Sequence, residues 1–142
     1  MMTKIKHSPV VEKEESGHLM NDRIKLVRTF WQLFSNQKWD EAKQLLHPDF
    51  IAEWPQSRER MNRANFIEVN RNYPGTHKIE VLQALETHNK VVTTVWIVAD
   101  TGQRTFANSF FEIKDRQIFK IEEYWAEPYS APESRKQWVE VY

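Results

Sequence analysis

Glu123 is the residue whose surroundings in the sequence most strongly suggest chemistry. It lies in Gln117–Ala126, where the alternation of a strand would place Phe119, Ile121, Glu123 and Trp125 on one face. Burial among apolar side chains disfavours a charged carboxylate, so such an acid is protonated, partnered or used in proton transfer. The pattern predicts a pocket with Glu123 as general acid or base. A structural acid, satisfied by an arginine, an indole N–H or a backbone amide, is an equally good interpretation.

Asn108 is the second candidate for chemistry, with Phe106 and Phe110 on its face of the preceding predicted strand. Adjacent antiparallel strands would bring Asn108 within reach of Glu123. Its amide could donate a hydrogen bond to a ligand carbonyl or oxyanion. It could equally be a buried amide that is bonded to Glu123.

Other chemistries find little support among the remaining residues. The histidines His47, His77 and His88 lie far apart and lack the HxH or HxxxH spacing of a metal site, so we predict no metal ion. The three glycines form no phosphate-binding loop, and the absence of cysteine excludes thiolate nucleophiles and disulfides. The arginine-rich segment 56–63 could meet an anionic substrate, but a solvated loop is the simpler interpretation.

The charge balance narrows the expected partners. Twenty basic and twenty acidic residues cancel, which gives no electrostatic reason to expect nucleic acid or a membrane surface as partner. No apolar run is long enough to cross a bilayer, and the N-terminus lacks the hydrophobic core of a signal peptide. We therefore expect a cytoplasmic protein with a small-molecule or protein partner.

One domain must position the candidate residues, because 142 residues suit a single core. Apolar residues spaced by three and four predict helices at residues 23–35, about 39–46 and about 62–72. Alternation predicts a brief strand at 50–54, and longer strands at 77–86, 91–99, 104–114 and 117–126. Short connections make the last four an antiparallel meander, so the fold class is α+β, with the helices on one face of a curved sheet.

The two ends of the chain read differently from this domain. Residues 1–19 are charged and lack a sustained period, so we interpret them as an N-terminal extension to a domain that spans 20–142. Residues 127–142 carry Trp138 and Tyr142 as aromatic anchors. We expect this tail to pack back on the domain or on a second subunit.

The order of these elements, together with FANSFFEIKDRQIFKIEEYWAEP at 106–128, resembles the SnoaL-like branch of the nuclear transport factor 2 (NTF2-like) superfamily. The resemblance implies a cone in which a curved mixed or antiparallel sheet wraps around three N-terminal helices. It also implies a pocket against the first helix, and a homodimer through the sheet. SnoaL-type cyclases place an acid/base aspartate where Glu123 stands. The three catalytic positions of ketosteroid isomerases match Phe30, Trp54 and Asn108, which lack those catalytic groups.

From these observations we expect a small, largely apolar organic ligand and no cofactor. The candidate catalytic residues are Glu123 and Asn108, in cofactor-independent isomerase, cyclase or lyase chemistry. The expected ligand-binding residues are Phe30, Trp31, Trp54, Phe110, Ile121 and Trp125. The alternative is a non-catalytic ligand-binding or dimerisation module.

Overall fold

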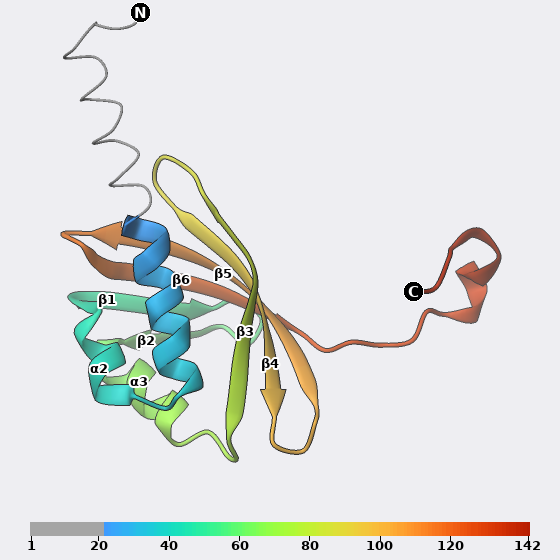
Figure 1. Cartoon of the computed structure of the whole chain (residues 1–142), viewed down its shortest axis with the longest axis horizontal. Helices are drawn as coiled ribbons and strands as arrows, with labels where there is room; N and C mark the ends of the chain where they lie inside the picture. Colours follow the sequence, from blue (N-terminus) through green and yellow to red (C-terminus); the bar gives the residue numbers. More distant parts are fainter. Residues whose placement is uncertain (1–21) are drawn as a thin grey trace, which may run out of the picture.

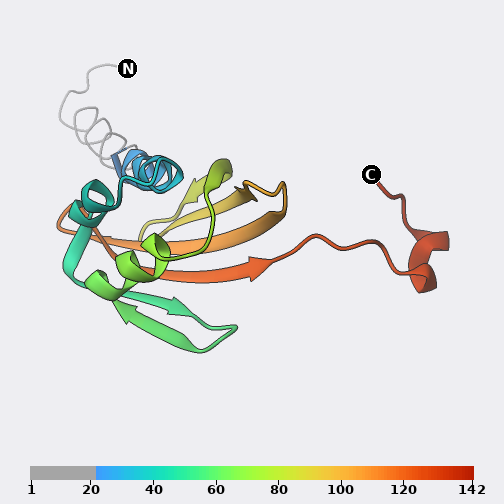
Figure 2. The ribbon, with the colours of Figure 1, turned by 90° about the horizontal axis from the view of Figure 1, so that it is seen from below.

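Helices cover one side of a curved, six-stranded sheet in the computed structural model, which describes residues 22–142 (Figures 1 and 2). The predicted α+β fold with helices on one face is confirmed. The N-terminal extension predicted at 1–19 lies outside the described residues. Within the described part of the chain, no helix is long and apolar enough to cross a membrane.

The described chain opens with a helix over 22–35, close to the predicted 23–35. Its buried side chains recur at spacings of three and four, as expected for a helix that presents one apolar face to the sheet: Val27, Phe30, Trp31 and Phe34. The end of the helix is tied to the sheet, because Ser35 Oγ accepts a hydrogen bond from the backbone N–H of Ile79 at 2.9 Å. The apolar face is thereby held over the concave side of the sheet.

The second helix and the first strand differ from their predicted bounds. Helix α2 spans Trp39–Gln44, and strand β1 spans Leu46–Trp54. The predicted helix end at residue 46 and the strand start at residue 50 are therefore wrong. Proline disfavours a helix at the residue before it, but an irregular strand tolerates it. The pairing of β1 with β6 (Gln117–Ala126) is indeed interrupted between Leu46 and Ile51, the stretch that contains Pro48.

Part of the segment predicted as a polar loop is an edge strand. Strand β2, Glu59–Asn62, pairs antiparallel with the end of β1. Only Met61 of its residues is buried, so the sequence shows no apolar alternation there. The last residue of β2 also starts helix α3, Arg63–Arg71, because the Asn62 side chain accepts a hydrogen bond from the N–H of Asn65 at 2.9 Å.

The remaining four strands have the predicted bounds and form the predicted antiparallel meander: β3 His77–Glu86, β4 Val91–Ala99, β5 Arg104–Lys114 and β6 Gln117–Ala126. The sheet order is β2-β1-β6-β5-β4-β3. Only the contact of β1 with β6 is parallel, so the sheet is mixed. The end of β1 therefore lies beside the end of β6, where Glu123 stands.

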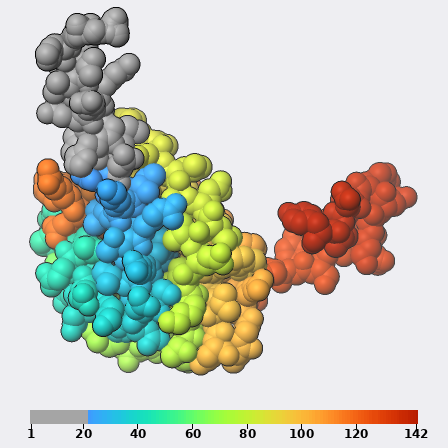
Figure 3. All heavy atoms as spheres, viewed as in Figure 1, coloured from blue at the N-terminus to red at the C-terminus, as the bar shows by residue number. Residues whose placement is uncertain are grey.

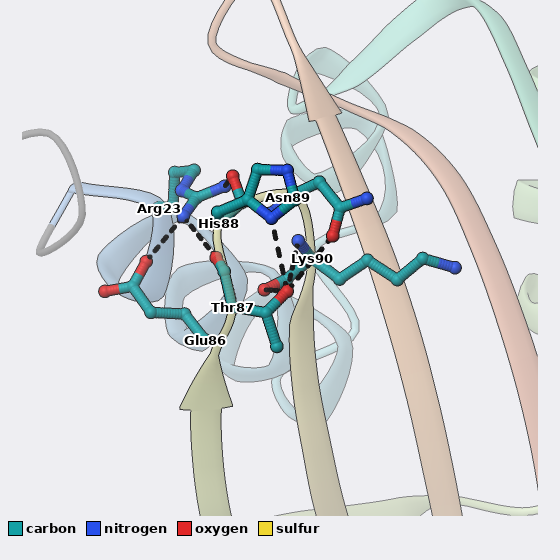
Figure 4. A network of polar contacts seen from close by, with 6 residues as sticks. All are labelled: Arg23, Glu86, Thr87, His88, Asn89 and Lys90. Carbon is teal, nitrogen blue, oxygen red and sulfur yellow. Dashed lines mark hydrogen bonds and ion pairs between the residues drawn. The ribbon is translucent and has the colours of Figure 1, made fainter.

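A guanidinium fixes the first helix to the β3–β4 hairpin (Figure 4). Arg23 Nη2 donates to the carbonyl of Thr87 at 2.7 Å, and Nη1 donates to the carbonyl of His88 at 3.3 Å. Nη2 also lies 3.1 Å from Glu86 Oε2, which makes no hydrogen bond of its own within the described part of the chain. Charge attraction and the two carbonyl bonds thus hold the helix over one end of the sheet.

Residues 127–142 form an arm that leaves the domain (Figures 1 and 3). It contains a short 3-10 helix, Glu133–Trp138, none of whose residues is buried. Trp138 is 75% exposed and Tyr142 is fully exposed, so the predicted packing of the tail on its own domain is wrong. The apolar side chains of the arm find no site among the core residues. Packing on a second subunit stays a prediction.

Candidate functional site

A cavity of about 610 Å³ lies between the helices and the concave face of the sheet. This volume falls within the range typical of small-molecule sites. Six aromatic rings contribute to its wall: Trp31, Phe34, Trp39, Trp54, Tyr73 and Trp125. The polar or charged residues at the wall include Gln37, Ser57, Glu59, Asn70, Arg71, Thr76, His77, Thr105 and Glu123. The cavity is thus mainly apolar, with Glu123 as its buried acid.

Glu123 is held by hydrogen bonds to both oxygens of its carboxyl group. The indole Nε1 of Trp54 donates to Oε1 at 2.9 Å, and the hydroxyl of Ser109 stands 2.8 Å from Oε2. The residue is only 2% exposed, although it contributes to the cavity wall. Trp54 packs edge to face on Trp125, with ring centroids 5.7 Å apart. The carboxyl group is therefore fixed in orientation at the base of the cavity.

Three strands supply a buried polar row beneath the cavity. Thr93 on β4 is the cross-strand partner of Ser109 on β5, and Ser109 is the partner of Glu123 on β6. All three face the helices and are buried. The indole Nε1 of Trp31 donates to the Thr93 hydroxyl at 3.0 Å. Two tryptophans of the cavity wall thus hydrogen-bond to this row from above.

Burial raises the pKa of Glu123 above its ordinary value of 4.5. Removal from water disfavours the charged form, and this is the largest effect. The hydrogen bonds from Trp54 and Ser109 favour the carboxylate and offset part of the rise in pKa. An acid with this balance can hold or release a proton nearer to neutral pH than an exposed glutamate can.

The predicted contact of Asn108 with Glu123 is wrong. Asn108 lies on the outer face of the sheet, where its Oδ1 accepts a hydrogen bond from Thr94 at 2.8 Å. The cause is a β-bulge: the β5–β6 register shifts between Glu112 and Ile113, so Phe119 is an extra residue in β6. A regular hairpin would pair Asn108 with Glu123, whereas the bulge turns Glu123 inward and pairs it with Ser109. Asn108 stays on the outer face, because β5 itself alternates regularly.

The other predicted ligand-binding residues fall into three groups. Trp31, Trp54 and Trp125 lie at the cavity wall, so the structure is consistent with a contact to a ligand. Phe30 and Ile121 are fully buried in the core and do not form the wall. Phe110 packs on Tyr124, a residue of the outer face, with ring centroids 6.2 Å apart. We therefore correct the predicted pocket by removing Phe30, Ile121, Phe110 and Asn108 from it.

Ser109, Thr93 and the polar side chains at the rim were missed. Ser109 and Thr93 are small hydroxyl residues at inward positions. Once the bulge in β6 is known, strand pairing places Ser109 opposite Glu123 and Thr93 opposite Ser109. At the rim, Arg71 pairs with Asp40 at 3.2 Å, and the ring of Tyr73 lies 5.2 Å from the ring of His77. Arg71 ends α3, Tyr73 lies in the turn that follows, and His77 begins β3, where the sequence shows only a polar helix end and the start of a strand.

No group of three or more His, Asp or Glu side chains that could hold a metal ion occurs within residues 22–142. At the wall, Arg71 pairs with Asp40 and Glu68, and Glu59 accepts a hydrogen bond from the Ser57 hydroxyl. What the site offers chemically is therefore a buried carboxyl group under an aromatic cavity. Such a site can hydrogen-bond a ligand, and it can exchange one proton.

Comparison with known proteins identifies related folds. The sequence model of the SnoaL-like domain matches residues 27–121. A candidate ketosteroid isomerase from Kribbella flavida is 26% identical, with a TM-score of 0.78 over 86% of this chain and 90% of its own. An NTF2-like protein of unknown function from Burkholderia xenovorans is 24% identical, with a TM-score of 0.76 over 87% and 97%. An epoxide hydrolase from M. tuberculosis is 17% identical, with a TM-score of 0.63 over 74% and 83%. Curated proteins provide no match.

Proposed function

This chain belongs to the SnoaL-like domain family, and from that premise we propose that it binds a small, largely apolar organic molecule in the cavity above Glu123. The observation that carries the proposal is the cavity itself, about 610 Å³ and lined by six aromatic rings. Flat apolar walls favour a flat apolar ligand, because both surfaces are removed from water on contact. A few polar groups then orient the ligand.

A binding experiment with a ligand of minimal polarity tests this proposal. The probe is 2-methylnaphthalene, a flat molecule that neither donates nor accepts a hydrogen bond, and its heat of binding is measured by titration calorimetry. We expect saturable binding with one site per chain. A cavity that binds no probe of this size would contradict the proposal.

Two tryptophan-to-alanine substitutions, one at the cavity wall and one on the arm, provide a matched comparison of binding. Trp125 lies at the cavity wall, whereas Trp138 lies on the exposed arm. Trp125→Ala removes a contact surface and is expected to weaken binding by roughly ten- to hundred-fold, because burying an aromatic ring stabilises a complex by about 1.5–3 kcal/mol. Trp138→Ala is expected to bind as the unchanged protein does. An equal loss of probe affinity in the two variants would show that the probe does not bind in the cavity.

Acid/base catalysis without a cofactor is a second candidate, favoured by the upward shift in the pKa of Glu123. A glutamate with a raised pKa can abstract a proton next to a carbonyl and return it elsewhere, as an isomerase, cyclase or lyase requires. A bicyclic ketone, 2-tetralone, tests this in heavy water, where NMR follows the exchange of its acidic C–H protons. We expect exchange with the unchanged protein and background exchange with Glu123→Gln. Equal rates would remove Glu123 from catalysis.

A further inference from the structure

We propose that the natural ligand of this cavity presents a hydrogen-bond donor, a hydroxyl or N–H group on a flat apolar frame, to Oε1 of Glu123. The inference rests on the proposed binding function and specifies the chemical class of the ligand. Its basis is the direction of each hydrogen bond around the carboxyl group.

The partner of Oε1 determines what that oxygen can do. An indole N–H can donate a hydrogen bond but cannot accept one. Because Trp54 Nε1 lies 2.9 Å from Oε1, this oxygen accepts that bond whether Glu123 is ionised or neutral. In the neutral acid the carbonyl oxygen accepts better than the hydroxyl oxygen, which favours Oε1 as the carbonyl oxygen and the proton on Oε2. Trp54 and Glu123 both contribute to the cavity wall, whereas Ser109, the partner of Oε2, does not, so we assign Oε1 to the cavity side.

The partner of Oε2 explains where the proton of the neutral acid resides. The Ser109 hydroxyl can either donate or accept, and it lies 2.8 Å from Oε2. In the ionised state Ser109 donates to Oε2. In the neutral state Oε2 carries the proton and donates to Ser109, which is completely buried in the sheet and forms no part of the cavity wall. The proton is therefore directed toward the sheet and away from a ligand.

Glu123 therefore offers the cavity a hydrogen-bond acceptor and no donor. A carboxyl oxygen has two lone pairs, and Trp54 uses one of those on Oε1. The second lone pair is the polar feature that Glu123 offers to the cavity. Trp31 cannot add a donor here, because its N–H is already bonded to Thr93 at 3.0 Å. A ligand hydroxyl would donate to the second lone pair of Oε1. A ligand carbonyl would instead place one acceptor against another, with no hydrogen bond between them.

Three probes with one ring system test this polarity by titration calorimetry. They are 2-naphthol, which donates a hydrogen bond, 2-methoxynaphthalene, which only accepts, and 2-methylnaphthalene, which does neither. The account expects 2-naphthol to bind roughly ten-fold or more tightly than either analogue, at a pH where the naphthol is neutral. Equal binding of the three would overturn the donor inference while leaving the cavity as a binding site. Binding of none would overturn both.

Two substitutions at Glu123 provide the controls. Glu123→Gln can keep its carbonyl oxygen against Trp54 and place its NH₂ group against Ser109, so the preference for 2-naphthol should persist at a reduced ratio. Glu123→Leu removes the acceptor, and the ratio of 2-naphthol to 2-methylnaphthalene affinity should fall to about one or below. If Glu123→Leu does not fold, the Gln variant decides the question. A preference for 2-methoxynaphthalene in the Gln variant would overturn the assigned polarity.

Discussion

Ser109→Ala is the substitution that most sharply tests how the sheet controls Glu123. It removes the hydroxyl 2.8 Å from Oε2 and leaves the Trp54 bond to Oε1 in place. Ser109 is fully buried on a central strand, and alanine has nearly the same shape, so the change is mainly the loss of one hydrogen bond. Water cannot easily replace the hydroxyl at this position.

The expected magnitude follows from the two protonation states. A hydrogen bond to a charged group contributes about 1.5–3 kcal/mol, and one between neutral groups contributes about 0.5–1.5 kcal/mol. The ionised form of Glu123 therefore loses about 1–2 kcal/mol more than the neutral form does when Ser109 becomes alanine. The acid-dissociation constant of Glu123 should fall by a factor of roughly five to thirty, which means that its pKa rises further.

The assay is a pH titration of Glu123, observed by the carbon-13 NMR signal of its labelled carboxyl group. Ser109→Thr should restore the original titration, because it keeps a hydroxyl at the same position. Asn108→Ala is the matched control: regular pairing would place Asn108 opposite Glu123, but the bulge pairs Glu123 with Ser109, and Asn108 lies on the outer face. An Asn108→Ala titration that shifts as much as that of Ser109→Ala would refute the register argument.

Three further predictions concern stability and assembly. Folding raises the pKa of Glu123 from 4.5, so the folded state binds the proton more tightly; the stabilisation that Glu123 contributes should be largest below pH 4.5 and be lost as pH rises through its folded pKa. Urea unfolding against pH should show that Glu123→Gln removes this decline, and parallel pH profiles would contradict it. Arg23→Met should lower the free energy of unfolding by about 2 kcal/mol, since it leaves the Glu86 carboxylate, 10% exposed, without its cation. Lys136→Met, in an exposed pair, should change it by less than about 0.5 kcal/mol, and equal losses would argue against the Arg23 contact. For the predicted homodimer through the sheet, Phe106→Glu on the outer face should convert a dimer to a monomer in light scattering, whereas an unchanged dimer mass would exclude this face.

The meander could be predicted from the sequence because its signals are local. Apolar alternation and short polar connections define β3 to β6, and the observed bounds agree with the predicted ones. The first helix was predictable for the same reason, since its buried residues follow a period of three and four. Where one period continues over nine or more residues, the sequence carries enough information to place an element.

The partner of Glu123 could not be predicted because a single bulge decides it. One extra residue, Phe119, shifts the β5–β6 pairing and exchanges the two faces of β6 before the level of the site, so that Glu123 points inward opposite Ser109. Phe106 and Phe110 made the face of Asn108 look like the inner one. In the structure these aromatic side chains instead pack on outer-face partners, Phe106 on Trp96 and Phe110 on Tyr124.

Edge strand β2 was missed for a different physical reason. Three of its four residues are exposed, so the strand exists because the end of β1 offers unpaired backbone groups, and its own side chains contribute little. The same polar segment also caps helix α3 through Asn62. Strand pairing that depends on backbone hydrogen bonds, and not on buried side chains, leaves little trace in the local sequence.

The titration of Glu123 with and without bound 2-naphthol tests the central claim most directly. If the probe donates a hydrogen bond to Oε1, it stabilises the ionised carboxylate more than the neutral acid, so the pKa of Glu123 should fall when the complex forms. The carbon-13 signal of the Glu123 carboxyl group reports this change. Saturated binding with no change in the pKa, or with a rise, would contradict the account.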